Sequence, residues 1–307
     1  MSDNTKQTLR IGWIGTGVMG LSMCGHLMDA GYPMTVFNRT PAKARPLVDR
    51  GAKLAASPRE VGEAGDIVFS IVGFPSDVEA VSIGPDGALS GMKPGALFCD
   101  MTTSSPALAA KIAAAAAEKG LVALDAPVTG GDVGAKAATL SIFVGGDAAG
   151  YERVKPCLER MGRNIMHCGG PGMGQQAKLA NQAAIAGVMF SVCESLIYAQ
   201  QAGLDIRRWH ELVSAGAAGS AAMKTLGARM LNGDFAPGFF IDHFVKDLGL
   251  VLEECRRMGL VLPGAELAEK FYRHIQAHGH GADGTQALIR ALAEFSGKRW
   301  TPVPARD

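Results

Sequence analysis

Short apolar runs alternate with amphipathic segments through the first 145 residues of the chain. The runs predict six β-strands, at 9–15, 34–38, 66–72, 96–100, 121–128 and 140–146. Helical spacing of apolar residues predicts helices at 19–30, 41–51 and 106–119. This alternation is typical of a mostly parallel sheet covered on both faces. A ligand of such a sheet binds beyond the carboxyl ends of the strands, so the residues that follow each strand are the candidates for chemistry.

The pattern changes in the second half, where the strand signal ends at about residue 150. A glycine-rich segment at 169–174 leads into a long helical pattern of low charge at 175–203. Further helices are predicted at 205–215, 219–231, 239–258, 263–278 and 284–296. The chain is therefore predicted to hold an α/β domain over 1–170 and an all-helical domain over 171–307.

Composition is compatible with two well-packed domains. The chain has 307 residues, of which 48% are hydrophobic and 19% are charged. A formal net charge of +1 gives no electrostatic reason to expect nucleic acid as a partner. Glycine is unusually frequent: the chain has 40 glycines among its 307 residues, which is nearly twice the usual share of ~7%.

The sequence predicts a cytoplasmic protein. The N-terminal segment is polar and lacks the apolar stretch of a signal peptide, and no membrane span is predicted. The six cysteines are scattered without a CxxC pair, which favours reduced thiols over disulfides, and no metal site is predicted. His278 and His280 are expected to be loop residues in a glycine-rich turn.

A GxGxxG motif follows the first predicted strand and opens the first helix. In this context it is typical of a Rossmann domain that binds a dinucleotide. Gly15 permits a tight turn, Gly17 lets the backbone approach a pyrophosphate, and Gly20 allows helix and strand to pack closely. The alternative is a glycine turn with a structural role only. The cofactor-binding residues predicted here are Gly15, Thr16, Gly17, Val18, Met19 and Gly20.

The end of the second predicted strand favours NADP over NAD. Domains that bind NAD commonly carry Asp or Glu there, for the ribose 2′-hydroxyl, but this chain has Asn38, Arg39 and Thr40. The Arg39 guanidinium can pair with a 2′-phosphate, and the two neighbours can add hydrogen bonds. The alternative is a solvated arginine beside NAD that is held less selectively.

Two further segments are predicted to lie along the cofactor. Gly73, Phe74 and Pro75 follow the third strand, and Thr103 follows the fourth. The alternatives are that Phe74 packs in the core and that the hydroxyls beside Thr103 cap the next helix.

Thr129, Gly130 and Gly131 follow the fifth strand. They offer a hydroxyl and backbone N–H groups to an anion such as a substrate carboxylate.

The long helix of the second half carries a lysine near its start. Lys178, Asn181 and Gln182 share one face, at spacings of three and four. A poorly solvated lysine there can exchange a proton with a substrate hydroxyl or carbonyl; the alternative is a snorkelling side chain at a helix end. Lys246 and Asp247 lie in another apolar helix, either as a buried ion pair or as a surface pair.

Four segments together resemble the β-hydroxyacid dehydrogenase family. They are GWIGTGVMG, DAPVTGG, GPGMGQQAKLANQ and HFVKDLGLVLEE. The family includes 3-hydroxyisobutyrate dehydrogenase, tartronate semialdehyde reductase and the glyoxylate/succinic semialdehyde reductases. The resemblance covers nearly the whole chain. It implies a Rossmann domain followed by an all-helical domain, a long interdomain helix that joins them, and a homodimer or homotetramer.

The resemblance also assigns roles. It implies that Lys178 is the catalytic acid/base, that Asn181 and Gln182 orient the substrate, and that Lys246, supported by Asp247, closes over nicotinamide and substrate. It further implies that the carboxylate binds at the segment Thr129, Gly130 and Gly131. The family usually has serine in place of Thr129, and many members have asparagine in place of Gln182. Both departures concern substrate choice more than reaction type.

The sequence therefore predicts an NAD(P)-dependent oxidoreductase that interconverts a small 3-hydroxy acid and its semialdehyde. In the reductive direction, protonated Lys178 donates to the aldehyde oxygen as hydride leaves the nicotinamide. Reduction of glyoxylate, succinic semialdehyde or tartronate semialdehyde is an alternative. Further rivals are an imine reductase, which usually lacks a lysine at this position, and a non-catalytic NADP-binding protein. A 6-phosphogluconate dehydrogenase would need a longer second domain.

Overall fold

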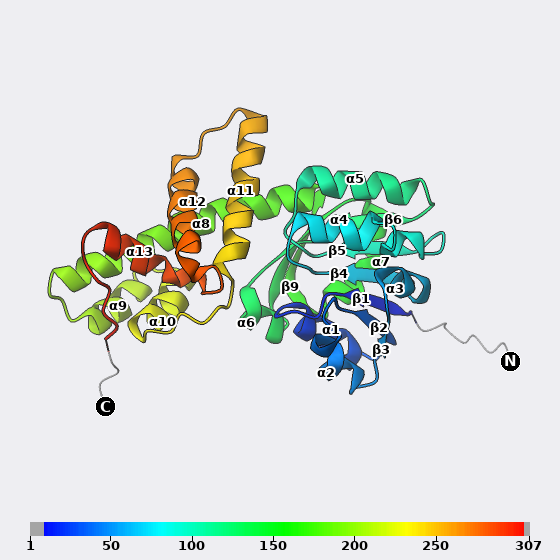
Figure 1. Cartoon of the computed structure of the whole chain (residues 1–307), viewed down its shortest axis with the longest axis horizontal. Helices are drawn as coiled ribbons and strands as arrows, with labels where there is room; N and C mark the ends of the chain where they lie inside the picture. Colours follow the sequence, from blue (N-terminus) through cyan, green and yellow to red (C-terminus); the bar gives the residue numbers. More distant parts are fainter. Residues whose placement is uncertain (1–8, 304–307) are drawn as a thin grey trace. The chain divides into compact units, whose positions relative to one another are not determined.

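The computed structural model describes residues 9–303. The chain divides into two compact units, with the boundary between Lys178 and Leu179 (Figure 1). The first unit is an α/β domain, and the elements of the second are helices. The helix α8 (Met173–Gln201) continues through the boundary. The predicted fold class is confirmed. The polar N-terminal segment, predicted to lack a targeting signal, falls mostly outside the described residues.

Nine strands form one sheet in the described part of the first unit, in the order β3-β2-β1-β4-β5-β6-β8-β7, with β9 beside β8. Strands β1 to β6 are parallel; β8 runs antiparallel to β6 and β7, and β9 runs parallel to β8. The strands are β1 (Ile11–Ile14), β2 (Met34–Phe37), β3 (Lys53–Leu54), β4 (Ile67–Ser70), β5 (Leu97–Asp100), β6 (Val122–Asp125), β7 (Val128–Thr129), β8 (Leu140–Gly145) and β9 (Gly162–Gly169). The strand order reverses at β1, and ligands bind at the carboxyl end of such a switch point.

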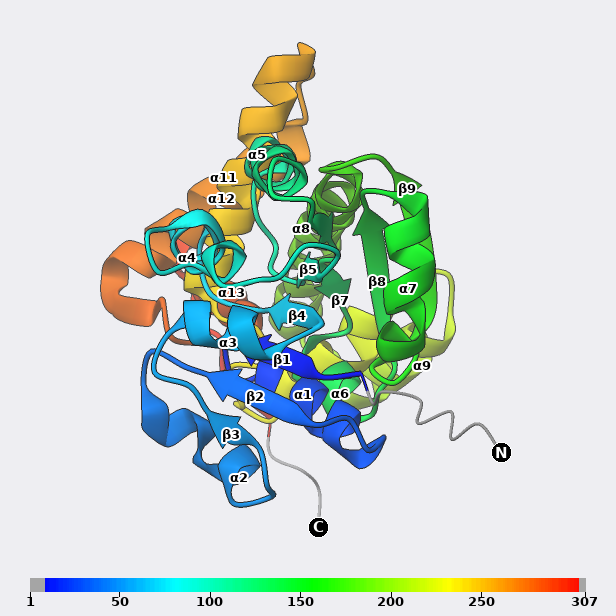
Figure 2. The same ribbon diagram turned by 90° about the vertical axis from the view of Figure 1, so that its right-hand side faces the viewer.

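Helices cover both faces of this sheet. The helices of the first unit are α1 (Gly20–Asp29), α2 (Arg45–Val48), α3 (Pro58–Ala64), α4 (Pro75–Ile83), α5 (Pro106–Ala117), α6 (Gly131–Lys136) and α7 (Ala148–Leu158). One apolar core joins the sheet to α1, α2, α6 and α7, and a second joins it to α3, α4 and α5. Figure 2 shows α4 and α5 on the side of the sheet opposite α7. The strands β1, β4 and β5 are buried along their whole length, which explains their continuous apolar runs.

Two predictions in this unit were wrong. The strand signal does not end at residue 150, because β9 follows α7. The side chains of β9 are mostly polar or exposed, so it lacks the apolar run of a buried strand. The segment 41–51 is not one helix but a 3₁₀ turn, Pro41–Ala44, followed by the single turn of α2. Pro46 lacks the N–H that one continuous helix over 41–51 would need at that position.

The second unit packs helices around its own apolar core. Its α-helices after α8 are α9 (Ile206–Ala215), α10 (Ala228–Leu231), α11 (Ile241–Met258), α12 (Pro263–Ile275) and α13 (Leu288–Phe295). Phe244 of α11 meets Tyr272 of α12 edge to face, with ring centroids 4.8 Å apart. The helix predicted at 219–231 includes a π-helical turn, Met223–Gly227, ahead of α10.

The histidines predicted as loop residues lie near the end of α12. Both fall in a short π-helical turn, Gln276–His280, whose backbone leaves helical geometry at His278. His278 is bonded to the carbonyl of His274, and His280 is bonded to Asp283. Their observed partners are therefore neighbours in the chain.

One helix of the described residues, α8, is long and apolar enough to cross a membrane by length and composition alone. Core helices of globular proteins meet the same criteria. Gln175, Lys178 and Gln182 are buried polar residues of α8, so part of the helix is packed inside protein.

Candidate active site

The three glycines of the GxGxxG motif differ in their surroundings. Gly15 has a φ of +96°, and a Cβ added there would lie 2.1 Å from the carbonyl oxygen of Ile71. A Cβ added at Gly20 would lie 2.0 Å from the carbonyl oxygen of Gly15. A Cβ at Gly17 meets no atom within 4 Å. Protein packing thus requires Gly15 and Gly20, whereas Gly17 leaves the space that a ligand needs to approach the backbone.

The loop between β1 and α1 presents polar groups suited to an anion. Met19, at the start of α1, provides no side-chain cap for the first N–H groups of the helix. The Thr16 hydroxyl is buried without a hydrogen-bond partner among the described residues. Val18 is exposed. Uncapped N–H groups and the helix dipole favour a phosphate here, so these residues fit the pyrophosphate of a dinucleotide.

Hydrogen bonds join this loop to the end of β2, and an ion pair joins the end of β2 to α4. The Thr16 N–H donates to Asn38 Oδ1 (3.0 Å), and the Asn38 amide donates to the Thr40 carbonyl (2.9 Å). Arg39 lies 3.1 Å from Asp77 Oδ1, and the other oxygen of Asp77 accepts the Phe74 N–H. Three segments predicted to bind cofactor are therefore neighbours in the first unit.

The Arg39 side chain is 87% exposed. Its ion pair with Asp77 is a surface pair and correspondingly weak. The guanidinium is therefore available to a 2′-phosphate.

The segments after β4 and β5 are also tied together. Gly73 and Phe74 lead into α4, which begins at Pro75. The Thr102 hydroxyl accepts the Val72 N–H and donates to Asp100 Oδ1. Thr103 follows and is half-buried. The cap of α5 is Ser105, which accepts the Leu108 N–H, so neither Thr102 nor Ser104 serves as that cap.

The segment predicted to hold a carboxylate lies at the end of β7. Thr129 and Gly131 are half-buried, and Gly130 is exposed. Gly130 and Gly131 both have positive φ, +130° and +64°. No atom lies within 4 Å of a Cβ added at Gly131. This backbone favours glycine and leaves space beside it for a small ligand.

Lys178 is only 6% exposed. Lys178 is the last residue of the first unit and lies on α8. It follows by about one turn the helix residues that are bonded to the end of β6 and to the segment after β5. Asp125 accepts the N–H groups of Gly172 and Gln175, and the Gln175 side chain bonds to the segment after β5. This burial argues against a solvated lysine at a helix end.

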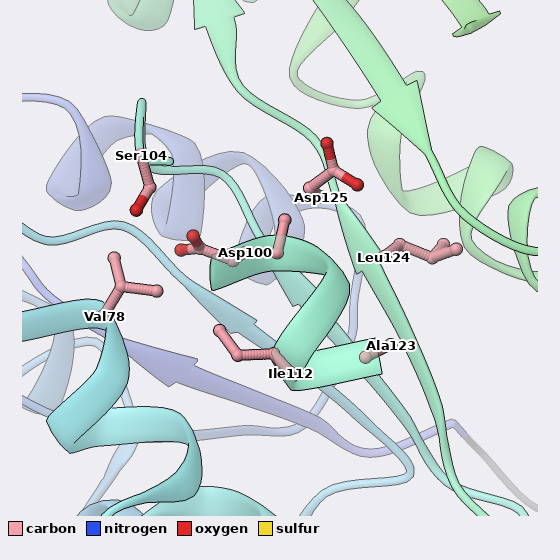
Figure 3. Close-up of a pocket in the computed structure, with 8 residues that line it drawn as sticks. Val78, Asp100, Ser104, Ile112, Ala123, Leu124 and Asp125 are labelled. Atoms are coloured by element: carbon pink, nitrogen blue, oxygen red, sulfur yellow. The ribbon is translucent and has the colours of Figure 1, made fainter. Parts of the chain in front are cut away.

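Two buried carboxylates, Asp100 and Asp125, lie at the ends of neighbouring strands of the sheet (Figure 3). Asp100 and Asp125 end β5 and β6 in register, and with Ser104 they border a cavity of about 10 Å³. Burial raises the pKa of Asp100 to about 6, although hydrogen bonds from Ser70 and Thr102 oppose the rise. Burial also raises the pKa of Asp125, against the effect of backbone N–H groups that include those of Gly172 and Gln175. The cavity has about the size of one water molecule.

Asn181, predicted to be catalytic, and the predicted binding residues Gln182 and Lys246 lie in the second unit, where they form one chain of contacts with Asp247. The Asn181 amide donates to Gln182 Oε1 (2.9 Å), and Gln182 Nε2 donates to Asp247 Oδ2 (2.6 Å). Asp247 Oδ1 lies 2.8 Å from Lys246 Nζ, and Asp247 is 1% exposed. The ion pair of Lys246 and Asp247 is therefore buried, not a surface pair.

Known proteins match nearly all of the chain. Residues 10–170 match the family model for the NAD-binding domain of 6-phosphogluconate dehydrogenase, and residues 172–292 match that for the NAD-binding domain of NADP-dependent 3-hydroxyisobutyrate dehydrogenase. A probable mitochondrial 3-hydroxyisobutyrate dehydrogenase-like protein of Arabidopsis thaliana is 54% identical, over 95% of this chain and 87% of its own. The chain belongs to the β-hydroxyacid dehydrogenase family.

Further relatives agree. The 2-hydroxy-3-oxopropionate reductase of Escherichia coli is 38% identical, over 92% of this chain and 97% of its own. The crystal structure of 3-hydroxyisobutyrate dehydrogenase from Salmonella typhimurium superposes with a TM-score of 0.84 at 30% identity, over 92% of this chain and 99% of that one. This β-hydroxyacid dehydrogenase is thus an NAD(P)-dependent oxidoreductase that acts on the CH–OH group of a hydroxy acid.

The structure adds residues that sequence reasoning missed. Asp100, Asp125 and Gln175 were not predicted to support the site. Asp125 and Gln175 connect strand ends to the start of α8, and Asp100 bonds Thr102 in the segment after β5. A signal was available, since a carboxylate at the end of an apolar strand is unusual. Their partners could not be inferred, because those partners are up to 73 residues away in the sequence.

Proposed function

We propose that this dehydrogenase interconverts a small 3-hydroxy acid and its semialdehyde, with Lys178 as the proton donor and acceptor. The observation that carries the proposal is the buried lysine one turn beyond the anchored start of α8. A buried amine that is packed in protein is held in one place, as proton transfer to a bound substrate requires. General acid–base catalysis of this kind contributes about 10²–10⁴ in rate.

NADP is the proposed cofactor, and NAD is the alternative. When bound, the nicotinamide supplies or accepts the hydride. NAD-binding domains commonly carry a carboxylate at the end of the second strand, which would repel a 2′-phosphate, and this chain has Arg39 there instead. The exposed guanidinium of Arg39 supports a preference for NADP. The glycine loop and the uncapped start of α1 would bind the pyrophosphate.

The substrate would be held at its carboxylate. Backbone N–H groups at Gly130 and Gly131, with the Thr129 hydroxyl, form the proposed carboxylate site. Asn181 is the proposed orienting amide, because both ends of the Gln182 amide are bonded to protein. Lys246 is proposed, beside Lys178, as a second lysine that contacts nicotinamide and substrate. Its ion pair with Asp247 keeps the cation of Lys246 in one place.

Reduction of 2-hydroxy-3-oxopropionate is the second candidate activity. It is favoured by the similarity to the reductase of Escherichia coli. The substrate has the carboxylate and the carbonyl that the proposed site requires. Glyoxylate and succinic semialdehyde offer the same two groups.

We further propose a soluble homodimer or homotetramer that binds neither nucleic acid nor membrane. The net charge of +1 supports the absence of a nucleic-acid partner. A cytoplasmic location is proposed for the chain itself, although the Arabidopsis relative is named as mitochondrial.

A turnover screen tests the proposed function. Purified protein is given 3-hydroxyisobutyrate, glycerate and 4-hydroxybutyrate with NADP⁺ or NAD⁺, and the matching semialdehydes and glyoxylate with NADPH or NADH. Absorbance of the reduced nicotinamide reports turnover. The proposal predicts turnover of at least one hydroxy acid–semialdehyde pair, faster with NADP(H). Binding of NADPH without turnover of any of these compounds would contradict it.

A further inference from the structure

The first turn of α8 is capped by a residue from a distant strand. Asp125 Oδ1 accepts the Gly172 N–H (2.8 Å), and Asp125 Oδ2 accepts the Gln175 N–H (2.7 Å). Asp125 ends β6 and is buried. Helices are usually capped by a side chain that immediately precedes them. A cap from β6 instead fixes the start of α8 to the sheet.

Glycines allow the helix to approach this carboxylate. A Cβ added at Gly145 of β8 would lie 2.5 Å from Asp125 Oδ1. A Cβ added at Gly174 would lie 2.6 Å from the Asp125 carbonyl oxygen and 2.5 Å from that of Phe143. The start of α8 is therefore in direct contact with β6 and β8, with no space for a side chain.

Gln175 connects the same turn to β5. Its Oε1 accepts the Ser104 N–H (2.8 Å), and its Nε2 donates to the Thr102 carbonyl (2.8 Å). The side chain thus bonds on both sides of Thr103, a predicted cofactor contact. Gln175 is fully buried, so neither bond is exchanged for water at low cost. Lys178 follows three residues later and lies on the same side of the helix.

We infer that Asp125 and Gln175 are positioning residues, which fix Lys178 relative to the segment Thr102–Ser104. The inference rests on the proposed role of Lys178. Proton transfer requires the donor within hydrogen-bond reach of its acceptor. A displacement of about 1 Å at a reacting group can reduce the rate by about 10²-fold. The side chains of Asp125 and Gln175 each make two buried hydrogen bonds to backbone groups. These bonds limit displacement of the helix turn that carries Lys178.

The test combines Gln175→Met, which keeps the length of the side chain but removes both bonds, with Asp125→Asn, which leaves one N–H without an acceptor. We expect kcat to fall by about 10–100-fold in each. The NADPH dissociation constant, measured by nicotinamide fluorescence, should stay within about twofold of the wild-type value. Amide hydrogen exchange should accelerate at the first turn of α8, because local opening becomes easier.

Two further variants separate positioning from general stability. Asp147 caps α7 by accepting the Gly150 N–H (2.7 Å), so Asp147→Ala removes a helix cap far along the chain from Lys178 and should leave kcat unchanged. In the double variant Gln175→Met/Lys178→Ala, kcat should equal that of Lys178→Ala alone, since positioning has no effect once the positioned group is absent.

The outcomes are distinguishable. Full kcat in Gln175→Met, while kcat of Lys178→Ala falls by about 10²–10⁴, would overturn the positioning role and leave the proposed function standing. An additive loss in the double variant would also overturn it. Activity retained in Lys178→Ala would instead remove the proposed function. If Asp125→Asn fails to fold, Gln175→Met and its double variant decide the question.

Discussion

Polar side chains at the strand ends are used mainly to hold backbone in place. Asp100 accepts three hydrogen bonds, from the Ser70 hydroxyl and from the hydroxyl and N–H of Thr102. Asp125 binds the first turn of α8 in the same way. Both carboxylates lie out of water, so each is stabilised by hydrogen bonds but destabilised by desolvation. For Asp100 the desolvation dominates, and this has a measurable consequence for stability.

Asp100 should make the fold less stable as the pH rises. Its pKa is about 6 when folded, against an ordinary value of 3.8, so ionisation is harder in the folded state. The contribution of Asp100 is therefore most favourable below pH ~4 and is lost as the pH rises through about 6. From pH 5 to 7.5 the loss amounts to roughly 1–1.5 kcal/mol.

Urea unfolding of wild type and Asp100→Asn across this pH range measures the effect. Between pH 5 and 7.5 the unfolding free energy of the wild type should fall by roughly 1–1.5 kcal/mol more than that of the variant. The variant has no carboxyl group at residue 100 to ionise. Parallel stability profiles would show that Asp100 ionises as easily in the folded protein as in the unfolded one.

At the residue scale, the sequence predicted roles that depend on local geometry. Positive φ at Gly15 and close packing at Gly20 follow from the motif, and both are observed. Asn38 was predicted to hydrogen-bond the cofactor, and in the structure its amide bonds Thr16 and Thr40, which a reading of the sequence did not indicate. The bonds of Gln175 could not be predicted, because they depend on tertiary contacts that leave no periodic signal in the sequence.

At the scale of elements, burial decided which predictions succeeded. The central strands β1, β4 and β5 were predicted because burial on both faces makes them continuously apolar. The short strand β3 and the half-exposed β9 were missed because neither forms an apolar run. The helix α8 was predicted with nearly correct bounds, from 175–203 against an observed Met173–Gln201. Its first two residues were assigned to a loop because glycines surround them.

Substitution by alanine should change the unfolding free energy in opposite directions at the two glycines of α8, Gly174 and Gly187. At Gly174 the new Cβ would lie 2.5–2.6 Å from two backbone oxygens, which cannot move without disturbing the sheet. We expect Gly174→Ala to lower the unfolding free energy by about 1–3 kcal/mol, a typical cost of overpacking. At Gly187, further along the same helix, a Cβ meets no atom within 4 Å. Gly187→Ala should raise stability by up to about 1 kcal/mol, because alanine favours helix.

Urea unfolding of the two variants under the same conditions gives this comparison. Equal effects of the two substitutions would contradict the close approach of α8 to β6 and β8.

At the scale of the whole molecule, one helix carries the proposed chemistry through two units. The first unit holds the glycine loop, Arg39 and Lys178, and the second holds Asn181, Lys246 and Asp247. Each unit has its own apolar core, so each can maintain its share of these residues. The sequence predicted two domains with a boundary between residues 170 and 171, whereas the compact units divide between Lys178 and Leu179. It also indicated Lys178 as the candidate acid and base. It did not indicate how the lysine is held, which depends on strand ends 50 residues or more away in the sequence.

The most direct measurement is the turnover of Lys178→Ala with saturating NADPH and semialdehyde, beside the binding of NADPH. Lys111→Ala, which removes an exposed lysine paired with Glu79 in the same unit, is the matched control. If Lys178 is the acid and base, kcat of Lys178→Ala falls by about 10²–10⁴ while the NADPH dissociation constant stays within about twofold, and Lys111→Ala keeps wild-type kcat. Near-wild-type turnover by Lys178→Ala with normal NADPH binding would contradict the assignment of Lys178 as the acid and base.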